Sequence, residues 1–326
     1  MACINLFKGL DTYMKLNTIK DAKIRFDSFT ERRFNIIGVF PAVLILAVVV
    51  AYPLLSLIYL SFTNTNAFNL LSGTQSFVGL DNFVNLFRDS IFLKSVFNTF
   101  YFTIVSTGLQ FLLGLLLALM VYPMSKRSKN AIVTLLLVPA MIADVAVGLL
   151  WSSLLNISTG VINYLVRLFG FDSIAFLGES KLAMLTIIII AVWQWFPYMF
   201  LFTLAGLESL SVHYIEVAKL EGCNAFQSLY YVTLPLISPV LFVALFFRIT
   251  SSIRVFDKIF VLTGGGPGSA TETISTYIQR LGFVNLKFGF ASAGGFIMLL
   301  IAMLIGLISL KFMYGSNKTS LKRGKI

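Results

Sequence analysis

Two long apolar stretches of this sequence each carry a cluster of polar side chains at helical spacing. The clusters are Gln194, Trp195 and Tyr198 in residues 182–207, and Arg248, Ser251 and Ser252 in residues 236–256. Steps of three and four residues place such side chains on one face of a helix. Aromatic rings stack on the apolar faces of sugar rings, whereas amides and hydroxyls bond sugar hydroxyl groups. Both clusters are therefore candidates for a polar-solute site.

The same side chains also have structural interpretations, which the sequence leaves open. Trp193 and Trp195 can pack against neighbouring helices, and the serines can bond backbone carbonyls or allow close helix contact. Arg248 and Asp144 can form an ion pair that settles both charges without any ligand.

Composition predicts the environment of these clusters. Apolar residues make up 58% of the 326 residues and charged residues only 12%, whereas a soluble domain carries about 25% charged residues. Lipid must therefore cover much of the surface. Because backbone groups find no water inside a bilayer, the spans must be helices, and the fold class is an all-α polytopic membrane protein.

Apolar runs long enough to cross a bilayer, roughly 20 residues each, recur about six times. The predicted spans cover residues 36–62, 97–122, 131–155, 182–207, 236–256 and 288–314. They form one transmembrane domain over residues 36–314, flanked by tails over residues 1–35 and 315–326.

Positive charge predicts the orientation of the spans, because Lys and Arg collect on the cytoplasmic side. Seven such residues lie in the N-terminal tail, three in residues 126–129 and four in the C-terminal tail. Both termini are therefore predicted to be cytoplasmic. The net charge of +11 is explained by the positive loops on one side of the membrane. The sequence has no basic patch with interleaved aromatic residues, so we expect no nucleic-acid partner.

Several kinds of chemistry have no support in the sequence. The Gly-rich run over residues 264–268 has no following Lys and is not a phosphate-binding loop. A single histidine, His213, excludes His-rich metal sites. There is also no nucleophile motif and no pair of carboxylates in one span. We therefore expect that the chain is not an enzyme and that it binds no cofactor or metal.

One loop, residues 208–235, is more than a connector. It is predicted to be cytoplasmic, yet it holds one Lys and three acidic residues. Ser211 is a possible N-cap for a short helix, and Gly222 would permit a tight turn. The loop contains two short motifs, Glu216-Val217-Ala218 with Gly222, and Val232-Thr233-Leu234-Pro235.

These motifs resemble the E-A-A-x-x-x-G and I-x-L-P elements of permease subunits of binding-protein-dependent ABC importers. The chain departs mildly from the pattern at Val217, Glu221 and Val232, and the spacing is intact. The flanking segments FVGLDNFVNLF, WQWFPYMFLFTLAGLESL and FDKIFVLTGGGPGSATETISTYI resemble the sugar-importing, maltose-type branch. The resemblance covers roughly residues 36–314.

The resemblance implies a type I importer fold in a bacterial cytoplasmic (inner) membrane, with a cytoplasmic coupling helix gripped by an ATPase. The implied coupling residues are Glu216, Ala218, Glu221, Gly222, Leu234 and Pro235. It also implies a second permease subunit, two ATPase subunits that bind ATP and Mg, an extracytoplasmic solute-binding protein and a saccharide substrate.

By the same resemblance, the two polar clusters would line the substrate path, and Arg248 facing that path would favour an acidic saccharide. An ion-coupled secondary transporter is the main alternative, although Asp144 is alone and no internal repeat is clear. A membrane enzyme acting on lipid-linked sugars is a third, less supported alternative because catalytic clusters are absent from the sequence.

Overall fold

The computed structural model describes residues 39–323. The predicted tail over residues 1–35 lies outside this part, as do residues 324–326. The chain divides into two units, Met1–Tyr59 and Leu60–Ile326. The first unit holds most of the apolar helix Val39–Ser61, and the second holds all the other described helices.

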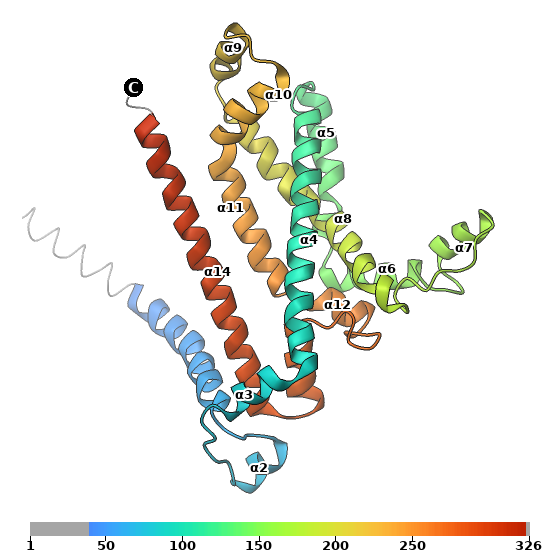
Figure 1. Cartoon of the computed structure of the whole chain (residues 1–326), viewed down its shortest axis with the longest axis vertical. Helices are drawn as coiled ribbons and strands as arrows, with labels where there is room; N and C mark the ends of the chain where they lie inside the picture. Colours follow the sequence, from blue (N-terminus) through green and yellow to red (C-terminus); the bar gives the residue numbers. More distant parts are fainter. Residues whose placement is uncertain (1–38, 324–326) are drawn as a thin grey trace, which may run out of the picture. The chain divides into compact units, whose positions relative to one another are not determined.

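The second unit is built from helices joined by short connections (Figure 1). They are α2 (Ala67–Ser72), α3 (Asp81–Arg88), α4 (Ser90–Val121), α5 (Lys126–Leu137), α6 (Asp144–Leu154), α7 (Val161–Leu168), α8 (Ser180–Glu208), α9 (Val212–Leu220), α10 (Ala225–Ser228), α11 (Leu234–Ile253), α12 (Asp257–Leu262), α13 (Ile274–Gln279) and α14 (Phe288–Arg323). A 3-10 turn, Pro139–Met141, and two π-helical turns, Leu229–Thr233 and Arg280–Val284, are also present. Over the described residues there is no β-strand, only an isolated bridge between Thr63 and Phe77, so the all-α class is confirmed.

Five described helices are long and apolar enough to cross a membrane. They are Val39–Ser61, Ser90–Val121, Ser180–Glu208, Ala225–Ile253 and Phe288–Ile308. These helices coincide with five of the six predicted spans. The last one extends further than predicted, since α14 continues to Arg323.

The predicted third span, residues 131–155, is not one continuous helix, and this part of the prediction was wrong. Pro139 has no backbone N–H to donate, and after its 3-10 turn Ile142 and Ala143 adopt extended conformations. The run is therefore divided into α5 and α6. With 11 residues, α6 is too short to cross a bilayer by itself, because that requires roughly 20.

Helix α8 lies at the centre of the packed region. One apolar core joins it to α4, α6 and α12 through Phe102, Val147, Ile187 and Ile259. Another joins it to α4 and α11 through side chains that include Phe200 and Ile237. The central position of α8 means that its side chains can face several other helices at once.

Gly114 allows α4 and α8 to pack closely. A Cβ atom at this position would lie 2.7 Å from the Cβ of Met199 and 2.7 Å from the backbone N of Phe200. Small residues permit such close approach between membrane helices. The glycine therefore fixes the distance between two of the helices that surround the candidate site.

Contacts at the helix ends show which loops lie together. Lys129 near the start of α5 forms an ion pair of 2.8 Å with Glu208 at the end of α8. At the other end of α4, Lys94 Nζ donates to the Gly268 carbonyl at 3.0 Å. Figure 1 shows α9 and α10 at the end of the bundle opposite to α3 and α12. This arrangement agrees with the predicted alternation of loops between the two sides.

The end of the second unit that contains α13 is fixed by buried polar groups. Arg280 pairs with Glu272 at 2.7 Å, and burial raises the pKa of the Glu272 carboxyl. The Tyr277 hydroxyl donates to Asp89 at 2.7 Å. Burial, together with this hydrogen bond, raises the pKa of Tyr277. The start of α4 is thus held against α13.

Candidate functional site

A cavity of about 380 Å³, here called the central cavity, brings together most of the predicted polar residues. It is lined by Phe102, Asp144, Ala191, Trp195, Tyr198, Phe247, Arg248, Ser251, Ser252, Arg254, Val255, Phe256, Asp257 and Lys258. Both predicted clusters contribute, one from α8 and one from α11. Of the six predicted substrate-path residues, only Gln194 does not line the cavity.

Arg248 is buried at the wall of the central cavity, with 7% of the residue exposed. Its Nε donates to Gln110 Oε1 at 2.8 Å, and its Nη2 donates to Ser252 Oγ at 3.3 Å. The guanidinium carbon lies 4.8 Å from the centre of the Trp195 ring. Helix α11 therefore holds this cation between the polar face of α4 and the indole of α8.

Asp144 pairs with Lys258 and not with Arg248. The Lys258 Nζ lies 3.1 Å from Asp144 Oδ1, and within the described part of the chain no ion pair joins Asp144 to Arg248. The interpretation of Arg248 and Asp144 as a structural ion pair is therefore corrected. The physical reason is that α12 follows α11 directly and packs on α6 in the core that includes Val147 and Ile259. This packing brings Lys258 to Asp144 at the start of α6.

Gln194 is placed differently from its neighbours in sequence. Its side chain is fully buried, and Nε2 donates to the Ile142 carbonyl at 2.8 Å. Ile142 lies in the non-helical break between α5 and α6, so its carbonyl has no helical N–H partner. Gln194 is thus a structural side chain that supports the break, whereas Trp195 on the next position faces the cavity.

The remaining predicted residues supply hydroxyl groups and an aromatic ring. Ser251 is exposed to the central cavity, and Ser252 Oγ lies 3.3 Å from the Thr107 hydroxyl. Tyr198 lines the cavity and packs its ring 4.6 Å from that of Phe202. The cavity therefore combines hydrogen-bonding groups with aromatic surface, as a site for a hydroxylated solute requires.

Sequence reasoning missed Lys258 and Gln110, which are part of this arrangement. Lys258 is 3% exposed, and its Nζ lies 5.5 Å from the centre of the Trp195 ring. Gln110 is fully buried and joins α4 to α8 by donating to the Ala191 carbonyl at 3.2 Å. A signal was available for Gln110, a polar side chain inside an apolar predicted span, whereas Lys258 lies just outside a predicted span, beside Asp257.

The connecting segment, residues 209–233, joins α8 to α11 and contains four of the six predicted coupling residues; the other two, Leu234 and Pro235, begin α11. Helix α9 ends in a Schellman motif: Gly222 has φ +79°, and the Cys223 N–H donates to the Ala218 carbonyl at 3.0 Å. Ala218 is 5% exposed, whereas Glu216 and Glu221 are exposed. The motif thus consists of a buried small residue, flanking exposed acids and a turn that favours glycine.

The second half of the connecting segment continues into α11 without a break. Asn224 caps α10, with Oδ1 accepting from the Gln227 N–H at 2.8 Å. A π-helical turn over Leu229–Thr233 follows, and Pro235 lies in the first turn of α11. Leu234 packs against the core shared by α4, α8 and α11. Movement of this segment would therefore pass directly into α11.

Aromatic side chains cover part of the connecting segment. Phe226, Tyr230 and Tyr231 are 75%, 58% and 72% exposed. The rings of Phe226 and Tyr230 are stacked at 6.4 Å, and Tyr231 lies edge-on to Tyr230 at 5.1 Å. Exposed aromatic side chains are enriched at protein-binding surfaces.

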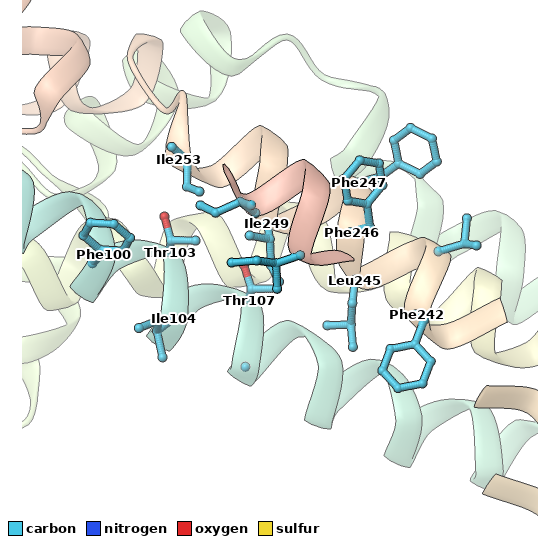
Figure 2. Close-up of a pocket in the computed structure, with 14 residues that line it drawn as sticks. Phe100, Thr103, Ile104, Thr107, Phe242, Leu245, Phe246, Phe247, Ile249 and Ile253 are labelled. Atoms are coloured by element: carbon cyan, nitrogen blue, oxygen red, sulfur yellow. The ribbon is translucent and has the colours of Figure 1, made fainter. Parts of the chain in front are cut away.

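A second cavity, the apolar groove of about 780 Å³, lies along α4, α11 and α14. Figure 2 shows Ile104 and Thr107 on one side of it and Leu245 and Phe246 on another. Only two of its fourteen lining residues, Thr103 and Thr107, have polar side chains. The apolar groove therefore suits lipid or apolar helix surface and not a hydroxylated solute.

The chain belongs to the family described as binding-protein-dependent transport system inner membrane component, whose model matches residues 110–322. It is 35% identical over 254 residues to the probable ABC transporter permease protein y4oQ of Sinorhizobium fredii, covering 78% of this chain and 81% of that protein. It is 32% identical over 266 residues to the trehalose/maltose transport system permease protein MalF of Thermococcus litoralis, covering 81% and 88%.

A solved structure has the same fold. It is described as the crystal structure of a bacterial alginate ABC transporter in complex with an alginate pentasaccharide-bound periplasmic protein. The match has a TM-score of 0.73 and 26% identity over 86% of this chain and 93% of that chain. The chain is thus a multi-pass membrane permease of the ABC importer class, and the comparisons give no support to the ion-coupled alternative.

Proposed function

We propose that this chain is the permease subunit of an ATP-driven importer that passes a saccharide through the central cavity by alternating access. One observation carries this proposal. The connecting segment, which bears the coupling motif, joins α8 to α11, and these two helices supply all the predicted residues that line the cavity. A force applied to the segment would therefore move the walls of the cavity.

The proposed complex contains three further kinds of component. A second permease subunit completes the path, two ATPase subunits bind ATP and Mg, and an extracytoplasmic solute-binding protein delivers the substrate. This chain carries no phosphate-binding loop in its sequence, so the energy must come from partners. Glu216 and the exposed Tyr230 would contact the ATPase, and Ala218 would keep α9 compact.

The proposed orientation places the connecting segment and both termini in the cytoplasm. The pairing of Lys129 with Glu208 puts a Lys/Arg-rich loop at the same end as the connecting segment, and such loops favour the cytoplasmic side. The break between α5 and α6 leaves the third crossing as an interrupted helix. Six crossings remain our proposal, because interrupted helices are tolerated where other helices cover the exposed backbone.

The saccharide assignment rests on both the cavity and the relatives. The cavity offers serine hydroxyls, a tyrosine and an indole, which are groups that bind sugars. Relatives are described as trehalose/maltose, sulfoquinovosyl glycerol and sn-glycerol-3-phosphate transport permeases. These names include neutral and anionic solutes, so the relatives do not decide the charge of the cargo.

ATPase measurements on the assembled complex test the proposal. The complex is purified through a tag on this chain and reconstituted in nanodiscs, and ATP hydrolysis is measured with loaded and unloaded binding protein. We expect hydrolysis to rise several-fold with loaded binding protein. A rate that ignores loaded binding protein, or uptake that follows an ion gradient without ATP, would contradict the proposal.

A further inference from the structure

The central cavity contains a buried cation with unused hydrogen-bonding capacity. An arginine has five N–H donors, and within the described residues the Arg248 guanidinium makes two hydrogen bonds, to Gln110 and to Ser252. Both acceptors are uncharged. No carboxylate of the described residues lies within 4.0 Å of Arg248, since the ion pairs join other residues.

Burial of such a cation is costly unless a negative charge compensates it. Asp144, the carboxylate that interacts electrostatically with Arg248, is already paired with Lys258 at 3.1 Å. Three of the cavity-lining side chains are cations and two are carboxylates, so one positive charge is left in excess. The described residues that line the cavity therefore leave it with a net positive formal charge.

The arrangement around Arg248 also restricts how a ligand can bind. The guanidinium lies over the Trp195 ring at 4.8 Å, and Lys258 Nζ lies 5.5 Å from the same ring. The indole thus holds cations in position in addition to offering surface for a sugar. A planar guanidinium with free donors matches a carboxylate or another oxyanion through paired hydrogen bonds.

We propose that the central cavity selects saccharides that carry an anionic group, with Arg248 binding that group. This inference rests on the proposed importer function and adds the charge of the cargo. Ser251 and Tyr198 then contact the sugar hydroxyl groups. The volume of about 380 Å³ lies near the lower end of the roughly 300–1,000 Å³ typical of small-molecule sites, so a short saccharide segment occupies it at any time.

Protection of a thiol introduced at the cavity wall tests the proposal without relying on the binding protein. Ser251→Cys places a thiol where the residue is exposed to the cavity. The assembled complex in nanodiscs is treated with N-ethylmaleimide in the presence of glucose, glucuronate or glucose 6-phosphate. Mass spectrometry of the peptide containing position 251 gives the rate of modification, independently of other thiols.

We expect at least one of the two anionic sugars to give half-protection at a concentration about tenfold lower than glucose, as charge-assisted hydrogen bonds imply. Preferential protection by glucuronate identifies a carboxylate as the group, and preferential protection by glucose 6-phosphate identifies a phosphate. In the Arg248→Gln variant, the difference from glucose should disappear. In the matched control Arg88→Gln, at an exposed arginine outside the cavity, the difference should persist.

Equal protection by all three sugars, no protection by any of them, or a difference that survives Arg248→Gln would overturn the proposal. The importer function would be judged separately. If loaded binding protein still raises ATP hydrolysis in such a case, the transport function stands and only the charge selectivity is lost.

Discussion

The connecting segment and the central cavity are built in different ways, although the same two helices join them. In the connecting segment, the key residues from Glu216 to Gly222 lie within seven consecutive positions, and one local turn at Gly222 ends their helix. In the cavity, Phe102 and Lys258 come from helices far apart in sequence. The first region follows from local backbone geometry, whereas the second depends on how distant helices pack.

The largest effect should come from breaking the ion pair between α6 and α12. Asp144→Ala removes the carboxylate that pairs with the buried Lys258, and we expect a loss of about 3 kcal/mol in the free energy of unfolding. Thermal unfolding of the purified protein in one fixed detergent measures the loss. Lys258→Met added to Asp144→Ala should recover part of it.

Asp172→Ala is the matched control, because Asp172 is exposed and should change stability by less than about 0.5 kcal/mol. If Asp144→Ala and Asp172→Ala have equal effects, the cavity does not depend on this tertiary pair, and the contrast with the connecting segment fails.

A smaller effect is expected at the contact between α4 and α8. Gly114→Ala would place a Cβ 2.7 Å from Met199 Cβ, and such overpacking costs about 2 kcal/mol. Gly108→Ala, on the same helix, meets no atom within 4 Å and should be neutral or slightly stabilising. Chemical denaturation in mixed micelles compares the two variants, and equal stabilities would show that α4 can shift away from α8 without cost.

Substitution of Gly222 in the connecting segment should act through the backbone conformation. Gly222 and Gly170 have φ +79° and +85°, and a Cβ at either would meet no atom within 4 Å. Alanine at each position should therefore cost about 1 kcal/mol from the left-handed conformation alone. Only Gly222→Ala should lower the ATP hydrolysis stimulated by loaded binding protein.

This pair separates coupling from stability, because both variants carry the same backbone strain. Equal stimulation in Gly222→Ala and Gly170→Ala would remove the coupling role of the α9 turn. Gly222→Trp adds bulk to the same strain and should abolish stimulation while leaving the spans in the membrane.

The smallest effect on stability is expected at the exposed aromatic residues. The double variant Tyr230→Ser and Tyr231→Ser removes side chains that are 58% and 72% exposed, so stability should change by less than about 0.5 kcal/mol. Co-purification of the ATPase subunits should nevertheless fall, since these rings belong to the proposed docking surface. Phe171→Ser, at a 69% exposed site on the opposite side, should leave co-purification unchanged.

The sequence predicted the long helices well, because a run of apolar residues without charge has few alternatives in a membrane. The prediction of one continuous helix was wrong over residues 131–155. This run is equally apolar, but its helix is interrupted at Pro139. Membrane helices often tolerate proline, as α8 does at Pro197. Whether a proline interrupts a helix depends on partners such as Gln194, which supports the free Ile142 carbonyl.

The candidate cavity was predicted only in part for a similar reason. Helical spacing grouped Trp195 with Tyr198 and Arg248 with Ser251 and Ser252, and all five residues line the cavity. Spacing could not distinguish Gln194 from Trp195, because adjacent residues on a buried helix face different neighbours. It also could not give Asp144 its partner, since Lys258 approaches from a helix outside the predicted span.

The sequence by itself determined the membrane environment, the order of the long helices and the turn at Gly222, because hydropathy and local backbone conformation act within a few residues. Only the tertiary structure decided the pairing of Asp144 with Lys258 and left Arg248 with uncharged partners. The energy of a buried charge depends on every group within a few ångströms, and packing brings those groups from distant parts of the chain.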